Sequence, residues 1–235
     1  MNGVLIITGP TAVFGSGHWV RMRLVALELR RRKIAVQLLC ADADEKIAAP
    51  LPYSVVVLDR RDTAFNAGLA ANAVKIAVDN RGQGREEADL VCDLLPHHEM
   101  NAQQYQHALA SLILPPAITA TPAAHERAQI TLCEDSEAAF AAADFPPAER
   151  LSPDAFHSGL MHSASPALYY GQALFEALYL GKHVRLYPVS DYHRKLAVDL
   201  YSRRILEPNL LSALDGRGLS RFAELVISAT KKKHE

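Results

Sequence analysis

Short apolar runs rich in β-branched residues alternate with helical patterns along the first half of the chain. The runs lie at residues 4–8, 35–40, 55–58, 75–78 and 90–95. Helices are expected at 17–32, more weakly at 62–71, and at 101–112. In the first of these, Val20, Leu24 and Leu27 recur at helical spacing. Strands that alternate with helices are typical of a parallel sheet with crossover helices, so the sequence predicts the α/β class.

Two consecutive prolines, Pro115 and Pro116, divide the chain. Because proline continues neither a strand ladder nor a helix interior, we expect a first lobe at 1–112, a linker at 113–128 and a second lobe at 129–235. A length of 235 residues suits one large domain or two small ones. The second lobe is expected to hold strands at 129–133 and 184–187, an alanine-rich stretch at 137–143, and helices at 172–180, 192–202 and 217–230.

The charge balance argues against nucleic acid as a partner. Lys plus Arg number 25 and Asp plus Glu number 26, so the formal net charge is -1. No apolar run approaches the roughly 18 residues of a membrane span, and the chain start lacks the features of a signal peptide. We therefore expect a cytoplasmic protein without a membrane span. Cys40, Cys92 and Cys133 each lie in an apolar run, which favours buried thiols over a disulfide framework or a zinc site.

A Gly-x-Gly sequence, Gly15 to Gly17, stands between the first strand and the first helix. Such a turn lets the backbone approach a ligand closely, and the helix start presents N–H groups to an anion. His18 follows where a neutral imidazole could accept a proton from water, and Arg21 lies one turn further on. Val20 replaces the third glycine of the dinucleotide fingerprint, so an NAD site is not expected. An ordinary tight turn is the alternative interpretation.

The segment 15–22, continued by Leu24 to Leu27, resembles the Gly-x-Gly-His-x-x-Arg-x-x-x-Leu-Ala motif of the UDP-sugar hydrolases of pseudaminic acid biosynthesis. Those enzymes are similar to the glycosyltransferase that adds N-acetylglucosamine to lipid-linked muramoyl peptide. The resemblance implies a GT-B-like fold, with two Rossmann-like parallel-sheet lobes and a ligand cleft between them. It also implies that His18 is the catalytic base and that Arg21 lies near the substrate.

Further stretches extend the resemblance. Residues 76–81 resemble the family's strand that ends in an acidic pair, although the second acid is here Asn80, and 88–95 resemble the next strand, which leads into a loop that here contains Asn101. Residues 171–181 resemble the helix whose acid holds the nucleotide ribose, and 191–197 take the place of an Asn-Gln segment. The implied substrate-binding residues are Gly15, Ser16, Gly17, Arg21, Asp79, Arg81 and Asn101, and the implied nucleotide-binding residues are Gly171, Gln172, Ala173 and Glu176.

The second lobe departs from the family pattern. Glu134 and Asp135 follow its first strand, where the family has a glycine-rich turn that meets the diphosphate. Two acids repel a diphosphate, and the later loop keeps only one glycine, Gly171. The chain is also shorter than its relatives by several dozen residues. The resemblance therefore implies a second lobe that is reduced.

Other site chemistries find less support. His97 and His98 are adjacent at a strand end and point to opposite faces, and His157 and His162 are five apart, off the i, i+4 spacing of a helix, so no metal site is expected. A nucleophile elbow around Ser16 lacks its first glycine. Asp42 and Asp44 stand where some Rossmann relatives present an acid to a ribose, but a solvated loop is the favoured interpretation.

The leading hypothesis is an enzyme of bacterial surface-glycan biosynthesis that hydrolyses a UDP-linked amino sugar to free sugar and UDP. His18 would deprotonate water, Arg21 and the helix start would steady the leaving diphosphate, and Glu176 would hold the ribose. No cofactor is expected, and the partner is a nucleotide-sugar or sugar; a homodimer is a further hypothesis. The alternatives are a non-catalytic, degenerate GT-B-like protein that binds a sugar or a partner, and a glycosyltransferase.

Overall fold

The computed structural model describes residues 3–10, 16–40, 53–123, 128–132, 151, 155–188, 190–203 and 211–232. The chain forms two compact units. Unit 1 comprises Met1–Leu94, Ser111–Ile113 and Arg217–Glu235, and unit 2 comprises Leu95–Ala110 and Leu114–Gly216. The chain therefore leaves unit 1 after Leu94, returns to it briefly at Ser111–Ile113, and returns again with its last helix.

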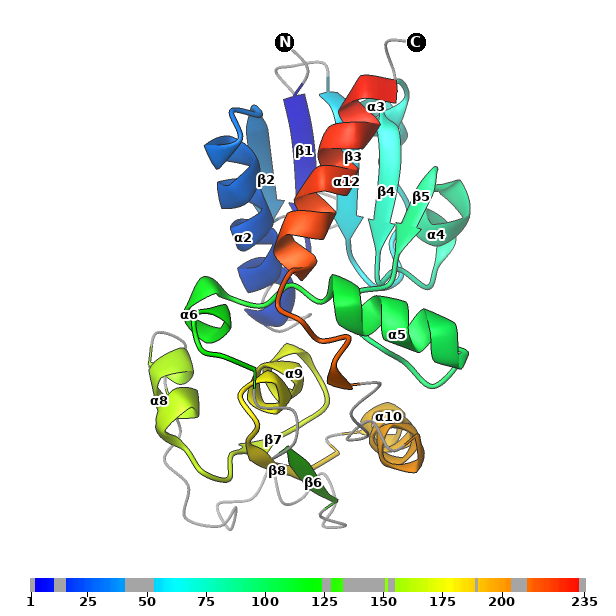
Figure 1. The fold of residues 1–235 in the computed structure, drawn as a ribbon. Helices are drawn as coiled ribbons and strands as arrows, with labels where there is room; N and C mark the ends of the chain where they lie inside the picture. The colour runs from blue at the N-terminus through cyan, green and yellow to red at the C-terminus, as the bar shows by residue number, and fades with distance from the viewer. Residues whose placement is uncertain are drawn as a thin grey trace. The chain divides into compact units, whose positions relative to one another are not determined.

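Unit 1 is built on a five-stranded parallel sheet of order β2-β1-β3-β4-β5 (Figure 1). The strands are β1 (Gly3–Thr8), β2 (Val36–Cys40), β3 (Tyr53–Asp59), β4 (Val74–Val78) and β5 (Leu90–Cys92). All residues of β1 and β3 are buried, as expected of central strands covered on both faces. The chain runs from β1 outward to β2 on one side and from β3 outward to β4 and β5 on the other, so the strand order reverses between β1 and β3. In open parallel sheets, ligands bind at such a switch point.

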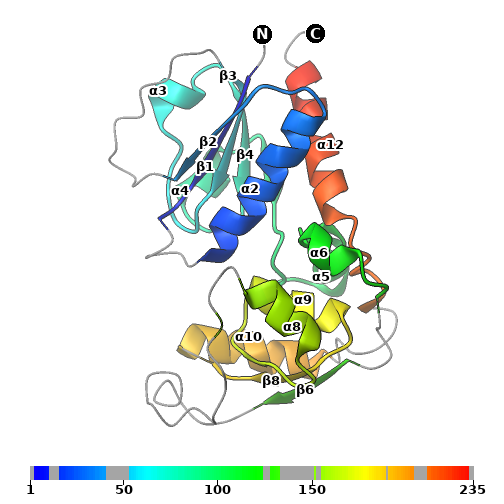
Figure 2. The ribbon, with the colours of Figure 1, turned by 90° about the vertical axis from the view of Figure 1, so that its left-hand side faces the viewer.

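Helices cover both faces of this sheet (Figure 2). On one face lie α2 (Ser16–Arg31) and α12 (Gly218–Lys232), and on the other lie α3 (Ala67–Ala70) and α4 (Gln83–Glu87). Successive side chains of a strand point to opposite faces, so alternate residues pack against the helices on each face. Val4, Ile6, Val55 and Val57 pack with Met22, Leu29, Phe222 and Val226 on the first face, and Leu5, Ile7 and Leu58 pack with Phe65 and Ala70 on the second.

Unit 2 holds a smaller parallel sheet of three strands in the order β6-β8-β7. Its elements are α5 (Ala102–Ser111), α6 (Pro116–Thr119), β6 (Gln129–Leu132), α8 (Phe156–His162), β7 (Ala167–Leu168), α9 (Gln172–Tyr179), β8 (His183–Leu186) and α10 (Asp191–Ser202). The helix α9 packs on β8 and is buried from Leu174 to Tyr179. The protein is thus a mixed α/β structure with two parallel sheets.

Polar contacts explain why residues 95–110 belong to unit 2. The buried Tyr170 hydroxyl donates to Pro96 O at 2.6 Å. Arg203 donates from Nη2 to His98 O at 3.2 Å, and its guanidinium lies 4.9 Å from the centre of the Tyr105 ring. These contacts join the segment before α5, and α5 itself, to the region of α9 and α10.

The five strands predicted in the first half are all present, and so are the helices at 17–32, 101–112, 172–180, 192–202 and 217–230, with small differences at their ends. The largest difference in a strand is at β5, which ends at Cys92 instead of residue 95. The helix expected at 62–71 is reduced to the single turn α3. The reason is that the Asn80 side chain donates to Arg60 O and Thr63 O, at 2.7 and 2.9 Å, and holds that segment in an irregular conformation.

The two units have different bounds from the predicted lobes. The helix α5 was expected in the first lobe and lies almost wholly in unit 2, whereas α12 was expected in the second lobe and completes the core of unit 1. The expected linker contains a helix, α6, because Pro116 stands in its first turn, where the missing N–H costs nothing. The short elements α4, α6, α8 and β7 were not predicted.

Two further predictions concern cysteines and membranes. Cys40 was expected to be buried but is exposed, because it ends β2 at the edge of the sheet, and Cys92 is half-buried. Within the described part of the chain, the model holds no helix long and apolar enough to cross a membrane. Predictions for Gly15, Asp42, Asp44, Cys133, Glu134, Asp135 and the stretch 137–143 lie outside the described residues.

Candidate functional site

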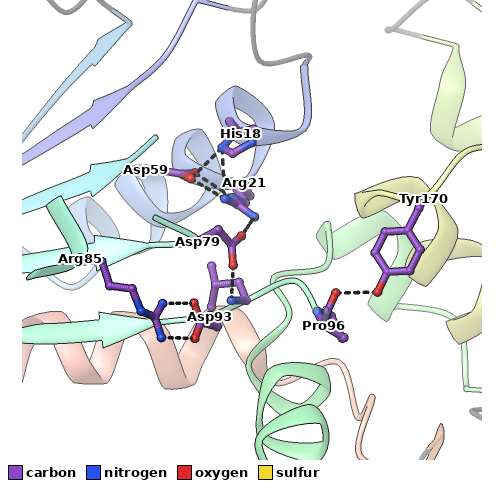
Figure 3. A network of polar contacts seen from close by, with 9 residues as sticks. His18, Arg21, Asp59, Asp79, Arg85, Asp93, Pro96 and Tyr170 are labelled. Carbon is purple, nitrogen blue, oxygen red and sulfur yellow. Dashed lines mark hydrogen bonds and ion pairs between the residues drawn. The ribbon is translucent and has the colours of Figure 1, made fainter. Parts of the chain in front are cut away.

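Four polar side chains meet at the carboxyl edge of the unit 1 sheet (Figure 3). They are His18 and Arg21 from the first two turns of α2, Asp59 at the end of β3, and Asp79 directly after β4. We call these four residues the His18 cluster. Asp59 reaches α2 because alternate residues of β3 share a face, and Asp59 follows Val55 and Val57 on the face that α2 covers.

The imidazole of His18 is paired with a buried carboxylate. His18 Nδ1 lies 2.7 Å from Asp59 Oδ1, and His18 and Asp59 are 8% and 0% exposed. Burial raises the pKa of Asp59, but Arg21 and His18 outweigh this effect and hold that pKa below its ordinary value. Asp59 is therefore ionised and only accepts hydrogen bonds, so Nδ1 is the nitrogen that carries the proton. In this tautomer Nε2 is the basic nitrogen.

The guanidinium of Arg21 is shared between two carboxylates. Its Nε donates to Asp59 Oδ2 at 2.7 Å, its Nη2 donates to Asp59 Oδ1, and its Nη1 donates to Asp79 Oδ2 at 2.6 Å. Arg21 is only 1% exposed. Burial lowers the pKa of Arg21, but the two carboxylates raise it above its usual value, so the group stays charged. A planar guanidinium suits this two-point contact, and an ammonium does not.

Asp79 links Arg21 to the end of the sheet. Its backbone is in the left-handed region, with φ of 46°, which Asp tolerates better than most residues. The backbone N–H of Asp79 donates to Cys92 O at 3.0 Å, and Oδ1 accepts from the backbone N–H of Leu94 at 2.7 Å. Asp79 therefore fixes the position of Arg21 relative to β4 and to the segment after β5.

Asp59 and Thr8 are the residues at this edge that sequence reasoning missed. Asp59 ends a buried apolar strand, and that is the only local signal for it, since His18 lies 41 positions away. Thr8 pairs with Asp59 in the β1–β3 ladder and is fully buried. Its Oγ1 makes no hydrogen bond to any residue that the structure describes. Thr8 adds a further polar group on the same edge.

The other predicted residues of unit 1 have separate positions. Ser16 is exposed and Gly17 half-exposed at the start of α2. Arg81 is exposed, and its backbone N–H donates to Arg61 O at 2.5 Å. The contacts described above for the His18 cluster do not include Ser16 or Gly17.

Asn80, which follows Asp79 in the chain, organises the loop beside the site. It is fully buried, and its Nδ2 donates to two backbone carbonyls while its Oδ1 accepts from Gly82 N at 3.0 Å and Arg85 N at 3.1 Å. A carboxylate in this position lacks the two donations. The amide is therefore required by the local structure, independently of any ligand.

In unit 2, the predicted substrate residue Asn101 begins a helix. Asn101 Oδ1 accepts from Gln104 N, and Gln104 Oε1 accepts from Asn101 N, both at 2.9 Å. This reciprocal pair is a capping box, which satisfies N–H groups at the start of α5. The side chain of Asn101 therefore has a structural function in α5.

The predicted nucleotide residues lie at and within α9. Gly171, Gln172 and Ala173 are half-exposed at its start. Glu176 is only 2% exposed, and its Oε2 lies 3.4 Å from His157 Nε2 on α8. This contact with Glu176 raises the pKa of His157 above its usual value, against burial, which lowers it. At 3.4 Å the two groups form an ion pair, and Oε2 makes no hydrogen bond of good geometry within the described structure.

No three histidine, cysteine or acidic side chains in the described segments lie close enough together to hold a metal ion. His162 Nδ1 lies 2.7 Å from the backbone carbonyl of Ser158, away from Glu176. His97 and His98 each lie near Glu99, at 3.8 and 4.0 Å.

The chain matches no protein-family model and no curated protein. The geometry of the His18 cluster is therefore the structural observation from which a function can be inferred.

Proposed function

We propose that this protein is a nucleotide-sugar-processing enzyme that hydrolyses a UDP-linked amino sugar to the free sugar and UDP. The observation that carries the proposal is the contact of His18 Nδ1 with Asp59 Oδ1 at 2.7 Å. That contact makes Nε2 the basic nitrogen of an imidazole at the edge of a parallel sheet where ligands commonly bind. A GT-B arrangement of the two units and a place in cytoplasmic surface-glycan biosynthesis belong to the same proposal.

In the proposed reaction, a water oxygen attacks the anomeric carbon of the sugar. His18 Nε2 takes a proton from that water as the new C–O bond forms, and the bond from the anomeric carbon to the diphosphate oxygen breaks. UDP leaves with the electron pair of that bond. The first turn of α2 contains no acidic residue, so the positive end of its dipole is available to stabilise the negative charge on the diphosphate.

The charge of the His18 cluster supports this role. With a neutral imidazole, the cluster has two carboxylates and one guanidinium, and therefore a charge of about -1. A proton taken up by His18 brings this sum to zero, so the buried carboxylate stabilises the imidazolium that forms. In unit 2, Glu176 would accept hydrogen bonds from the ribose hydroxyls, with Gly171, Gln172 and Ala173 beside it.

One observation favours a second candidate, a non-catalytic protein that binds a sugar or a protein partner. Arg21 and Glu176 are both implied ligand residues, yet each already has an oppositely charged partner within the chain. A site can keep such contacts after its catalytic function is lost.

The test is release of UDP from UDP-N-acetylglucosamine and other UDP-linked amino sugars with no acceptor present. We expect the protein to release UDP, and His18→Ala to lower the rate roughly 10²–10⁴-fold while its circular dichroism spectrum is unchanged. The matched control is His107→Ala, because His107 is an exposed residue of α5.

An unchanged rate in folded His18→Ala contradicts the proposal. If no UDP-sugar is hydrolysed, calorimetric titration with UDP and with free amino sugars tests the second candidate. Release of UDP only after an acceptor is added would indicate a glycosyltransferase.

A further inference from the structure

We propose that Asp59 is the positioning residue of His18, and that Arg21 and Asp79 hold Asp59 in place instead of binding the substrate. The proposal rests on the proposed function in one respect, namely that His18 acts as a base. It differs from the role that the motif resemblance implies for Arg21, which is a place near the substrate.

The contact with Asp59 decides which ring nitrogen of His18 carries the proton. If His18 Nδ1 were the unprotonated nitrogen, it could accept from Arg21 Nη2 at 3.2 Å, but its lone pair would also face Asp59 Oδ1, another acceptor, at the shorter distance of 2.7 Å. Protonation at Nδ1 turns this repulsion into a charge-assisted hydrogen bond. Because Asp59 is completely buried, no bulk water competes with it for the proton of His18. Asp59 therefore selects the tautomer and fixes the plane of the ring.

The guanidinium of Arg21 is already engaged by two carboxylates within the chain. Nε and Nη2 contact one carboxylate side by side, and Nη1 contacts the other. Arg21 is only 1% exposed, so a diphosphate that bound it would have to displace Asp59 or Asp79 and leave a buried carboxylate without its cation. Three of the five N–H groups of Arg21 thus hold Asp59 and Asp79.

The whole chain of contacts is rigid. From Leu94 the contacts run through Asp79, Arg21 and Asp59 to His18, as Figure 3 shows for the labelled side chains. The members come from α2, β3, the residue after β4 and the segment after β5. His18 and Arg21 are thus anchored on the helix that covers the sheet, and the other members are anchored on or just after its strands. A base held in this way loses little entropy when a water molecule is activated.

The first experiment needs no substrate. Nitrogen-15 NMR of the His18 ring, assigned by loss of its signals in His18→Gln, reports which ring nitrogen carries the proton at alkaline pH. We expect the Nδ1–H tautomer in the wild-type protein and a shift towards Nε2–H in Asp59→Asn. The matched control is Arg85→Lys, because Arg85 forms an exposed ion pair with Asp93 at 2.7 Å in the same unit.

The second experiment tests Arg21 and Asp79. Under the proposal, Arg21→Lys and Asp79→Asn both lower kcat and leave the affinity for UDP within about 3-fold, since they act through His18. A tenfold weaker UDP affinity in Arg21→Lys, measured by calorimetry, would overturn the positioning role of Arg21. If Arg21→Lys does not fold, Asp79→Asn decides the question, because its amide oxygen still accepts one hydrogen bond.

The two readouts separate this inference from the proposed function. If Asp59→Asn changes the tautomer but no UDP-sugar is hydrolysed, the positioning contact stands and the hydrolase proposal fails. If hydrolysis requires His18 but Asp59→Asn keeps both the tautomer and kcat, the hydrolase proposal stands and the positioning role is overturned. If the hydrolase proposal and the positioning role of Asp59 are both correct, kcat of Asp59→Asn falls roughly 10²–10⁴-fold with KM nearly unchanged.

Discussion

Each unit buries one carboxylate against a histidine, and the two carboxylates are satisfied to very different degrees. In unit 1, Asp59 accepts from both His18 and Arg21, and both of its oxygens are used. In unit 2, Glu176 has His157 at 3.4 Å, and its Oε2 has no well-formed hydrogen bond within the described structure. A carboxylate with several donors holds its neighbours in place, whereas one with a single ion-pair partner contributes little to rigidity.

The two environments explain this difference. Asp59 stands at a strand end, where the β1–β3 ladder fixes its backbone and a helix start brings two donors to it. Glu176 lies in the middle of α9 among buried apolar neighbours, and the partner that the described residues give it, His157, comes from the short helix α8. The comparison suggests that unit 1 carries a preorganised site and unit 2 an adaptable one. The following predictions test this contrast.

The largest effect is expected from Arg21→Met. It leaves Asp59 and Asp79 without their shared cation, and such a change costs about 3–5 kcal/mol of unfolding free energy. Trp19, on α2, is the only tryptophan of the chain, so its fluorescence during urea unfolding reports on unit 1 alone. The comparison variant in unit 2 is Arg203→Met, since Arg203 pairs with Asp199 at 2.8 Å but both are part-exposed. Its unfolding is followed by far-ultraviolet circular dichroism, because Trp19 does not report on unit 2. Equal losses in the two variants would remove the contrast between the units.

A second prediction concerns the stability of unit 1 at acid pH. Because Arg21 and His18 hold the pKa of Asp59 below its ordinary 3.8 in the folded state, against burial, its ionised form stabilises unit 1 above that pH. The contribution is lost as the pH falls below 3.8 and through the lower folded value. Urea midpoints from Trp19 fluorescence should therefore fall steeply in this range.

The control for this loss of stability at acid pH is the Asp59→Asn variant. This variant should be less stable at neutral pH, and its midpoint should depend less on pH below 4, since the titrating group is gone. A variant with the same acid dependence as the wild type would show that other carboxylates dominate.

For unit 2, Glu176→Gln is expected to change the unfolding free energy by less than about 1 kcal/mol. The change leaves His157 without its anion, but His157 is part-exposed and can become neutral, so no buried unpaired charge remains, and the desolvation cost of the carboxylate is removed. The measurement is urea unfolding at pH 8 followed by far-ultraviolet circular dichroism. A loss above about 2 kcal/mol would mean that Glu176 is held as firmly as Asp59.

The smallest effect is expected from His157. Glu176 raises the pKa of His157 above 6.5, so the pair stabilises unit 2 fully below pH 6.5. This contribution is lost as the pH rises through the raised folded value, and for a part-exposed pair it amounts to about 0.2–1 kcal/mol. Stability measured from pH 6 to pH 9 should decline by this amount in the wild type. His157→Asn should remove the decline, and its persistence would assign it to another group.

Much of the fold follows from local patterns in the sequence. The strands of unit 1 are apolar runs rich in β-branched residues, and α2 and α12 have an apolar stripe at helical spacing, so their positions could be predicted. Which sheet α12 covers could not, because Phe222 and Val226 would suit either unit as apolar residues. Elements such as α4 and β7 are too short to show a period.

The candidate site was predicted in part for a related reason. His18 and Arg21 stand in one motif and meet in space, as expected of residues one helical turn apart. Asp59 carries no motif, and only the pairing of β3 with β1 brings it to α2. The ion pair of Glu176 with His157 likewise depends on how α8 packs, which no spacing along the chain encodes.

The return of α12 to unit 1 has a consequence for how the protein folds during its synthesis on the ribosome. The first strand is synthesised long before Phe222 and Val226, which cover the same core. Until translation reaches α12, one face of the nascent sheet lacks its second helix and exposes apolar side chains to water. A chain that stalls after β8 is therefore expected to be a good substrate for chaperones, although every residue of the His18 cluster has already been made.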